Sequence, residues 1–264
     1  MRLRPYLRAL QVQTQSTLRY RGNVLAFLSY VLIPPLAVFF LWRAVLGGGR
    51  TLGGYDLSAM VTYYIVAQFF VANAPLSAWS EISEEIRDGR LSLWLVRPVD
   101  HFLLYLSRNL GAWIPYWIMG LLGAAAVAGI LHSHFRLPAE AWRGPVALGF
   151  WLVGVVLAFA WGYTLNLLAF WTERTAGIVG AADAAAVFLA GGFVPLDILP
   201  LREVWLFLPF RFVGWFPAQV FLGRVSPERL PGELGLLLGW LFLFVAGAKL
   251  IWRLGLRNYQ GAGL

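Results

Sequence analysis

The chain alternates between long apolar runs and short polar segments, and these runs restrict its fold more than any other feature. Six of them approach or exceed the roughly 20 residues that a helix needs to cross a bilayer, at 24–46, 57–79, 111–131, 145–171, 176–194 and 234–252. Only 13% of the residues are charged and 59% are hydrophobic, whereas soluble domains carry about 25% charged residues. Outer-membrane barrels would show short alternating segments instead. The sequence therefore predicts an all-α membrane protein with six transmembrane helices.

The positive charges indicate how such a bundle is oriented. The chain carries 21 Lys and Arg against 13 Asp and Glu, a net charge of +8. In a soluble protein this charge would suggest nucleic acid, but in a membrane protein it is typical of Arg in cytoplasmic loops that face anionic lipid. With six spans, both termini lie on the side that holds most of these residues. We therefore expect both termini in the cytoplasm, a multi-pass location in the cell (inner) membrane, contact with membrane lipid and no nucleic-acid partner.

The first 22 residues form a separate basic segment. Leu3, Leu7 and Leu10 recur at helical spacing among five Arg residues, and Pro5 fits a first helical turn. We predict an amphipathic interfacial helix at 1–22 that lies on the membrane surface; a disordered basic tail is the alternative. A single six-span transmembrane domain then covers 23–254, and a cytoplasmic tail covers 255–264.

The most charged stretch of the chain, EISEEIRDGRLSLWLVRPVD, lies at 81–100 between the second and third runs. We expect the second span to continue as a helix to Gly89, a residue that favours a helix end, and Asp100 to cap the next helix. Helical spacing places three acidic side chains on one face and two isoleucines on another, namely Glu81, Glu85 and Asp88, and Ile82 and Ile86. The result would be a charged knob at 80–100 that carries apolar residues. A solvated loop with a charged helix end is the alternative interpretation.

The connection between the fifth and sixth runs, 195–231, is apolar and aromatic but contains six prolines. It is too apolar for a solvated loop and too often interrupted for a continuous span, a combination typical of re-entrant segments. We predict an outer re-entrant helical hairpin, with Trp205 and Trp215 at headgroup level. Its prolines include Pro195, Pro200 and Pro209, the last of which precedes Phe210.

A few polar residues interrupt the apolar runs. Asn166 and Asp183 flank a short turn at similar distances, so they should lie at similar depth on neighbouring antiparallel spans. A membrane-buried Asp costs at least about 2.5–3.5 kcal/mol, so it usually faces protein or water. Asp183 therefore lines a translocation path or a dimer seam, or it forms a hydrogen bond with Asn166 that merely joins two helices. Gln68 and Asn73 in the second run are further path candidates.

The sequence lacks the residues that several chemistries require. A phosphate-binding loop needs a Lys followed by Ser or Thr, but the one lysine, Lys249, precedes Leu250. If ATP and magnesium are used, another polypeptide must bind them. The chain has no Cys, and His132 and His134 lack a nearby third ligand. We expect no catalytic, cofactor or metal site in this chain, and a protein that is not itself an enzyme.

Three segments carry a family resemblance. The stretch EIRDGRLSLWLVRPV resembles the cytoplasmic loop of type-2 ABC transporter permeases, and GGFVPLDILPLREVWLFLPFRF is similar to the outer hairpin of that family. The closing LRNYQGAG is similar to the tail of the same branch. With the surface helix and the six spans, the resemblance covers nearly the whole chain.

The resemblance implies the transmembrane subunit of an ATP-driven exporter. Two such subunits, identical or homologous, would form the path as a dimer, and a separate cytosolic ABC ATPase would drive them. The loop would be the coupling helix that docks on this ATPase, through Glu81, Glu84, Glu85, Arg87, Asp88, Leu93, Trp94 and Arg97. The alternative is a membrane substrate-capture subunit of an ATP-driven importer, which would hold a ligand pocket within one subunit and lack the Pro-rich hairpin. A membrane enzyme is a third possibility.

Overall fold

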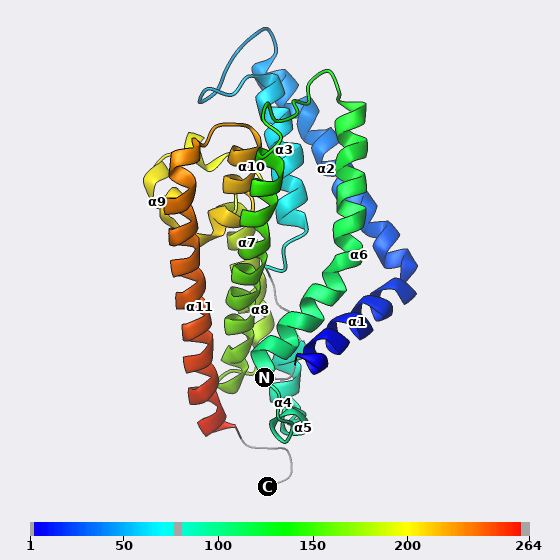
Figure 1. The fold of residues 1–264 in the computed structure, drawn as a ribbon, viewed down its shortest axis with the longest axis vertical. Helices are drawn as coiled ribbons and strands as arrows, with labels where there is room; N and C mark the ends of the chain where they lie inside the picture. The colour runs from blue at the N-terminus through cyan, green and yellow to red at the C-terminus, as the bar shows by residue number, and fades with distance from the viewer. Residues whose placement is uncertain (1–2, 77–80, 260–264) are drawn as a thin grey trace.

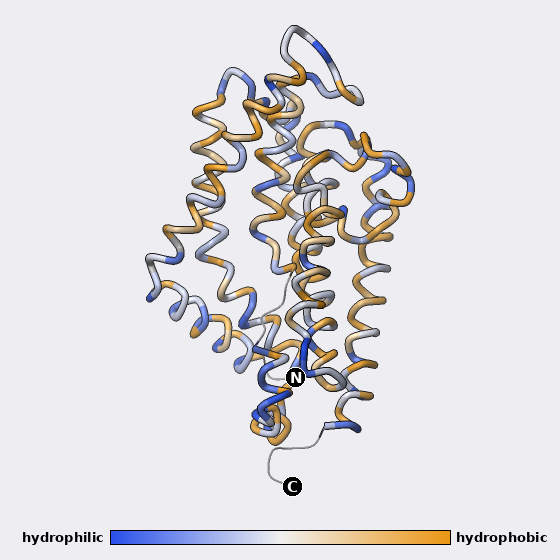
Figure 2. Tube along the Cα trace, turned by 180° about the vertical axis from the view of Figure 1, so that it is seen from behind, coloured by the Kyte–Doolittle hydropathy of each residue, from blue (hydrophilic) through white to orange (hydrophobic). Residues whose placement is uncertain are grey.

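The computed structural model describes residues 3–76 and 81–259, and their regular secondary structure is entirely helical (Figure 1). Four long helices dominate it, and each is long and apolar enough to cross a membrane. They are α2 (Arg21–Leu46), α6 (His101–Ile130), α7 (Arg143–Asn166, extended by the 3-10 turn Leu167–Phe170) and α11 (Leu230–Asn258). Hydrophilic residues gather at the two ends of the bundle, and the long helices between them are mostly hydrophobic (Figure 2).

The second and fifth predicted spans are shorter than expected. They are α3 (Leu57–Ala72) and α8 (Thr175–Leu189), with 16 and 15 residues. At a rise of about 1.5 Å per residue each is roughly 24 Å long or less, against a hydrocarbon core of about 30 Å. The prediction of six helices of full membrane length is thus correct for four of them, and the other two are shorter apolar helices.

The expected helix from the second span to Gly89 is interrupted. α3 ends at Ala72, and the chain continues without helix from Asn73 to Leu76. Pro75 explains this end, because proline disfavours helical geometry in the residue before it and has no backbone N–H to donate. The predicted end of the span at Trp79 lies outside the described residues. A separate helix, α4 (Glu81–Arg87), follows.

Side chains from α6, from α7 and from the helix end itself satisfy carbonyl groups at this end of α3. The indole N–H of Trp151 donates to the carbonyl of Phe70 at 2.9 Å, and that of Trp117 donates to the carbonyl of Asn73 at 2.8 Å. The amide of Asn73 donates to the carbonyl of Phe69 at 2.7 Å. These bonds matter because an unpaired carbonyl in an apolar interior is costly. α6 and α7 thus hold the end of α3 in place.

The N-terminal segment forms a helix, as predicted, and it packs against α6. α1 (Arg4–Arg19) lies across the lower end of α6 (Figure 1), where the absence of a side chain at Gly111 lets the two backbones touch. A Cβ atom there would lie 2.3 Å from the carbonyl oxygen of Leu10. The Thr14 hydroxyl donates to the Gly111 carbonyl at 2.8 Å. Leu3 and Leu7 remain exposed beside this contact face.

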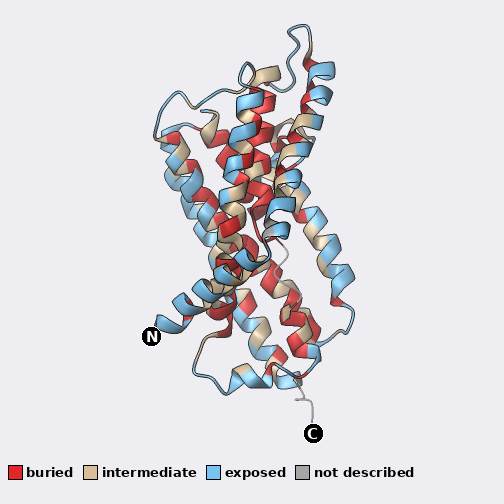
Figure 3. Cartoon of the chain, turned by 90° about the vertical axis from the view of Figure 1, so that its right-hand side faces the viewer, coloured by how far each residue is buried: buried red, intermediate tan, exposed pale blue. Residues whose placement is uncertain are grey.

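The core of the bundle is formed by α3, α7 and the segment after α8, and buried residues concentrate along its axis (Figure 3). In contrast, α2 and α11 leave most of their apolar side chains uncovered. Exposed apolar surface of this extent is typical of contact with lipid. Examples are Ile33, Phe40, Phe242, Leu243 and Leu250.

The predicted outer hairpin forms a compact cap on the bundle. It contains α9 (Arg202–Phe207) and α10 (Trp215–Phe221), joined by the 3-10 helix Pro209–Val213. Residues 209–220 are all buried, including Phe210 and Pro209, while Pro195 is buried and Pro200 exposed at its entry. Trp205 is half-buried. Trp215 is buried among core residues, so its side chain packs against protein, and its depth in the membrane stays a prediction.

Candidate functional site

The charged segment at 81–100 lies at the end of the bundle opposite the hairpin, near the end of α11 (Figure 1). It consists of α4, a turn at Gly89 and the single helical turn α5 (Ser92–Leu95). Gly89 adopts a φ of +74° just after α4, a left-handed conformation that suits glycine and ends helices. At the far end, the carboxylate of Asp100 accepts a hydrogen bond from the amide of Leu103 at 2.9 Å and caps α6. Both predicted helix boundaries are confirmed.

The isoleucine face of α4 anchors this segment to the transmembrane helices. Ile82 is 1% exposed and Ile86 is 5% exposed. Both belong to a core cluster with Phe102 from α6 and with Phe159 and Tyr163 from α7. Because these side chains are fully packed, α4 is joined to the membrane helices through a continuous apolar contact.

The acidic face differs from the prediction. Glu85 is 6% exposed and lies beside the Tyr105 side chain, so it does not belong to an exposed charged surface. The other acidic residues stay accessible. Glu81 accepts a hydrogen bond from Arg108 of α6 at 2.8 Å, and Glu84 is half-buried. Seven residues of helix offer too little surface to keep every acid outside once the two isoleucines are buried.

Two further contacts hold the segment between other elements. Arg87 donates through Nη1 to the carbonyl of Glu173, in the connection between α7 and α8, at 2.9 Å. The Tyr259 hydroxyl donates to the carbonyl of Gly89 at 2.6 Å and accepts from the amide of Ser92 at 3.2 Å. Tyr259 follows the end of α11, so the end of the last helix is also hydrogen-bonded to the knob. The sequence pattern did not single out this tyrosine.

The tip of the segment is apolar and exposed. Leu93 is 61% exposed, Leu95 45% and Val96 83%. The Arg97 guanidinium stacks over the Trp94 ring at 4.6 Å, and Asp88 pairs with Arg90 at 3.0 Å beside them. Leu95 and Val96 are additional candidate residues, which only the burial pattern separates from their apolar neighbours. An exposed apolar tip within a charged rim is the usual composition of a protein-binding surface.

Inside the bundle, the polar residues are distributed as follows. Asn166 is buried and donates to the Gly162 carbonyl at 2.9 Å, and Asp183 is half-buried on α8. Gln68 is buried in α3. Asn73 is fully buried at the end of α3, where its contacts complete that helix end.

α8 presents an unusual surface of small residues. Gly177, Gly180, Ala181 and Ala184 are exposed and lie on one face at helical spacing. A Cβ atom at either glycine would meet nothing within 4 Å. Small residues spaced four apart permit close packing of membrane helices, and no described element of the protomer packs on this face. Asp183 lies at its edge.

At the end of the bundle opposite α4 and α5, a polar network joins the hairpin to the loop before α3. The Tyr55 hydroxyl donates to the Asp197 carboxylate at 2.9 Å and accepts from Gln219 at 2.6 Å. The indole of Trp215 also donates to Asp197, at 2.9 Å. Burial, and after it the charge of Asp197, raises the pKa of the Tyr55 hydroxyl. This tyrosine therefore remains a neutral donor and links the loop before α3 to Asp197 and Gln219 of the hairpin segment.

Potential metal ligands do not converge in the described residues, where no group of three His, Cys, Asp or Glu side chains is close enough to hold an ion. The described geometry is thus that of an integral membrane protein of helical type, with an anchored knob at one end and a fastened hairpin at the other.

The comparison with protein families gives a more specific assignment. The family model of the ABC-2 family transporter proteins matches residues 32–263. The chain therefore belongs to this family and is a multi-pass membrane component of an ABC-2 transporter. Membership implies association with an ABC ATPase. The search of curated proteins gives no match.

Proposed function

We propose that this chain is the permease subunit of an ABC exporter, that it forms the translocation path as a dimer, and that a separate cytosolic ATPase drives it. The observation that carries the proposal is the knob of α4 and α5, with its apolar tip exposed and its base packed in the core. A solvated loop would not need such anchoring. An importer capture subunit would not need the Pro-rich hairpin.

The knob can transmit force because its two sides have different partners. The exposed side, with Leu93, Leu95 and Val96, offers the ATPase an apolar contact. The buried side, with Ile82 and Ile86, contacts α6 and α7. When ATP binding closes the ATPases, a displacement of the tip would move these spans as rigid bodies. ATP and magnesium belong to the ATPase in this scheme, and the permease carries no nucleotide site.

The dimer would meet at α8. Its small-residue face fits close packing with a second membrane helix, and Asp183 at the edge of that face would then line the path between the two subunits. We expect Asp183→Asn to lower transport while leaving assembly unchanged, because the substitution removes a charge and keeps the size. Transport at the wild-type rate would contradict the path role.

Co-purification tests the proposed partner. The chain is expressed with candidate cytosolic ABC ATPases, and the detergent-solubilised complex is isolated through a tag on the permease. The expected result is a stable complex that hydrolyses ATP. Charge reversal at Glu84 should weaken it, whereas Arg87 is left unchanged because it binds the Glu173 carbonyl and holds the segment. Because Glu85 is buried, its reversal would disturb folding and is unsuitable. A complex that forms equally well without the tip residues would contradict the proposal.

A further inference from the structure

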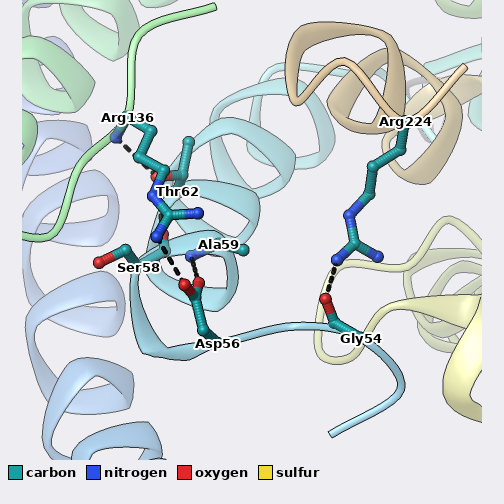
Figure 4. A network of polar contacts seen from close by, with 7 residues as sticks. All are labelled: Gly54, Asp56, Ser58, Ala59, Thr62, Arg136 and Arg224. Carbon is teal, nitrogen blue, oxygen red and sulfur yellow. Dashed lines mark hydrogen bonds and ion pairs between the residues drawn. The ribbon is translucent and has the colours of Figure 1, made fainter. Parts of the chain in front are cut away.

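Three arginines line a cavity at the end of the bundle opposite α4 and α5. The cavity has a volume of about 550 Å³. It lies between the loop before α3, the loop between α6 and α7, and the turn after α10. Its charged lining consists of Arg136, Arg143, Arg224, Asp56 and Glu140. Figure 4 shows Arg136 and Arg224 reaching toward the 54–56 loop from opposite sides.

The guanidinium groups are held in place by their surroundings. Arg224 donates to the Gly54 carbonyl, and its guanidinium lies over the Tyr55 ring at 3.5 Å. The turn that presents this carbonyl requires positive φ at both of its glycines, 57° at Gly53 and 79° at Gly54, a geometry that glycine adopts without strain. The site is therefore largely formed before any ligand arrives.

The other two arginines lie in the α6–α7 loop and at the start of α7, and contacts with neighbouring residues hold both in place. Arg143 is 7% exposed and donates to the Val225 carbonyl at 3.0 Å and to Glu140. Arg136 pairs with Asp56, and its backbone N–H donates to the Thr62 hydroxyl at 2.9 Å. A side chain that is already ordered loses less entropy when it binds a ligand.

Each guanidinium group of the cavity has a carboxylate partner. Arg136 pairs with Asp56, Arg143 pairs with Glu140, and Arg224 lies 3.9 Å from Asp197, so the attraction for a ligand comes from the N–H donors that these pairs leave free. Each guanidinium has five N–H donors, and the bonds within the protein use only some of them. Planar groups with several donors suit the oxygens of phosphate.

Apolar residues complete the lining. Leu137, Pro138, Phe221 and Leu222 belong to the same cavity, and Leu137 is 80% exposed. An inorganic ion would gain nothing from this surface, whereas a phosphate that carries a hydrocarbon portion would contact both parts. The cavity also lies at the ends of α3, α6 and α7, where lipid headgroups would be found.

We propose that this cavity binds a phosphate-bearing anion, supplied as the headgroup of an anionic lipid. Arg136 and Arg224 contact the phosphate oxygens, Arg143 contributes charge from the wall, and Leu137 lies along the start of the acyl portion. The proposal does not depend on the transport function. The binding experiment is also independent of how the chain is oriented in the membrane.

The test uses the purified full chain in detergent and native mass spectrometry. Phosphatidylglycerol and phosphatidylcholine are titrated separately, and glycerol 3-phosphate is titrated as a soluble source of the same group. We expect saturable binding of phosphatidylglycerol in preference to the zwitterionic lipid. Arg136→Gln should weaken it about tenfold, the effect of one charge-assisted hydrogen bond, and Arg136→Lys should weaken it less.

The matched control is Arg202→Gln. Arg202 is exposed on the hairpin at the same end of the bundle and pairs with Glu203 at 2.9 Å, but it lies outside the cavity. Its substitution should leave binding unchanged. Saturable binding of glycerol 3-phosphate alone would support the phosphate site and overturn the lipid source. Binding of phosphatidylglycerol to the wild type that does not saturate would overturn the site. An equal loss of binding in Arg202→Gln would overturn it as well.

Discussion

The exposed tip of the knob leads to a quantitative prediction for Val96→Asp. Val96 is 83% exposed in the protomer, so the substitution should leave folding unchanged. In the proposed complex, burying a valine side chain contributes about 1.5 kcal/mol, the lower end of the range for apolar side chains. A carboxylate at the same position would also lose hydration. Together these effects should exceed about 2 kcal/mol, which is roughly a 30-fold weaker affinity for the ATPase.

The assay is a titration of fluorescently labelled ATPase against the permease in lipid nanodiscs. The control is Val12→Asp, the same chemical change in α1 near the same end of the bundle, where the valine is 55% exposed. We expect the control to bind like the wild type. Affinity within twofold of wild type for Val96→Asp, or an equal loss in the control, would refute the assignment of the tip as the docking surface.

Three further predictions concern other parts of the molecule. Tyr259→Phe removes the hydrogen bonds to Gly89 and Ser92, which should cost about 1 kcal/mol and speed amide hydrogen exchange at 89–95; unchanged exchange would show that the tyrosine does not hold the knob. Gly180→Leu adds a side chain where the protomer has space, so the melting temperature should stay constant while dimers disappear in mass photometry; persistent dimers would place the seam elsewhere. Asp56→Ala removes the cap of α3 and should destabilise the protein by about 1 kcal/mol. The hydrogen bond from the Ala59 amide chiefly lowers the pKa of Asp56 below its ordinary 3.8, so this stabilisation is complete above pH 3.8 and is lost as the pH falls through the lower native pKa. The difference in melting temperature from wild type should therefore narrow on acidification, and a constant difference would contradict this.

Local signals in the sequence predicted several helix boundaries correctly. Gly89 and Asp100 act through their own backbone and side chain, so their roles do not depend on distant residues. The isoleucine spacing in α4 likewise predicted which face carries apolar side chains. Length and hydropathy identified the four long helices, because crossing a bilayer requires an apolar segment of a given length.

Other features depend on tertiary contacts that the sequence pattern does not contain. The early end of α3 follows from Pro75, but Trp117 and Trp151, which are distant in sequence, stabilise that end by bonding its carbonyl groups. Glu85 was expected outside, yet burial of the two isoleucines turns it toward Tyr105. In the arginine-lined cavity, Arg224 is far in sequence from Arg136 and Arg143, and only folding brings it to them.

Labelling of a single cysteine at the tip tests the central claim most directly, because the natural chain contains no cysteine. Leu93→Cys is treated with a membrane-impermeant thiol reagent in intact cells and in inverted membrane vesicles, with and without the ATPase. The account predicts no labelling in intact cells, labelling in the vesicles, and protection when the ATPase is bound. Labelling in intact cells, or labelling of the vesicles that the ATPase does not reduce, would contradict it.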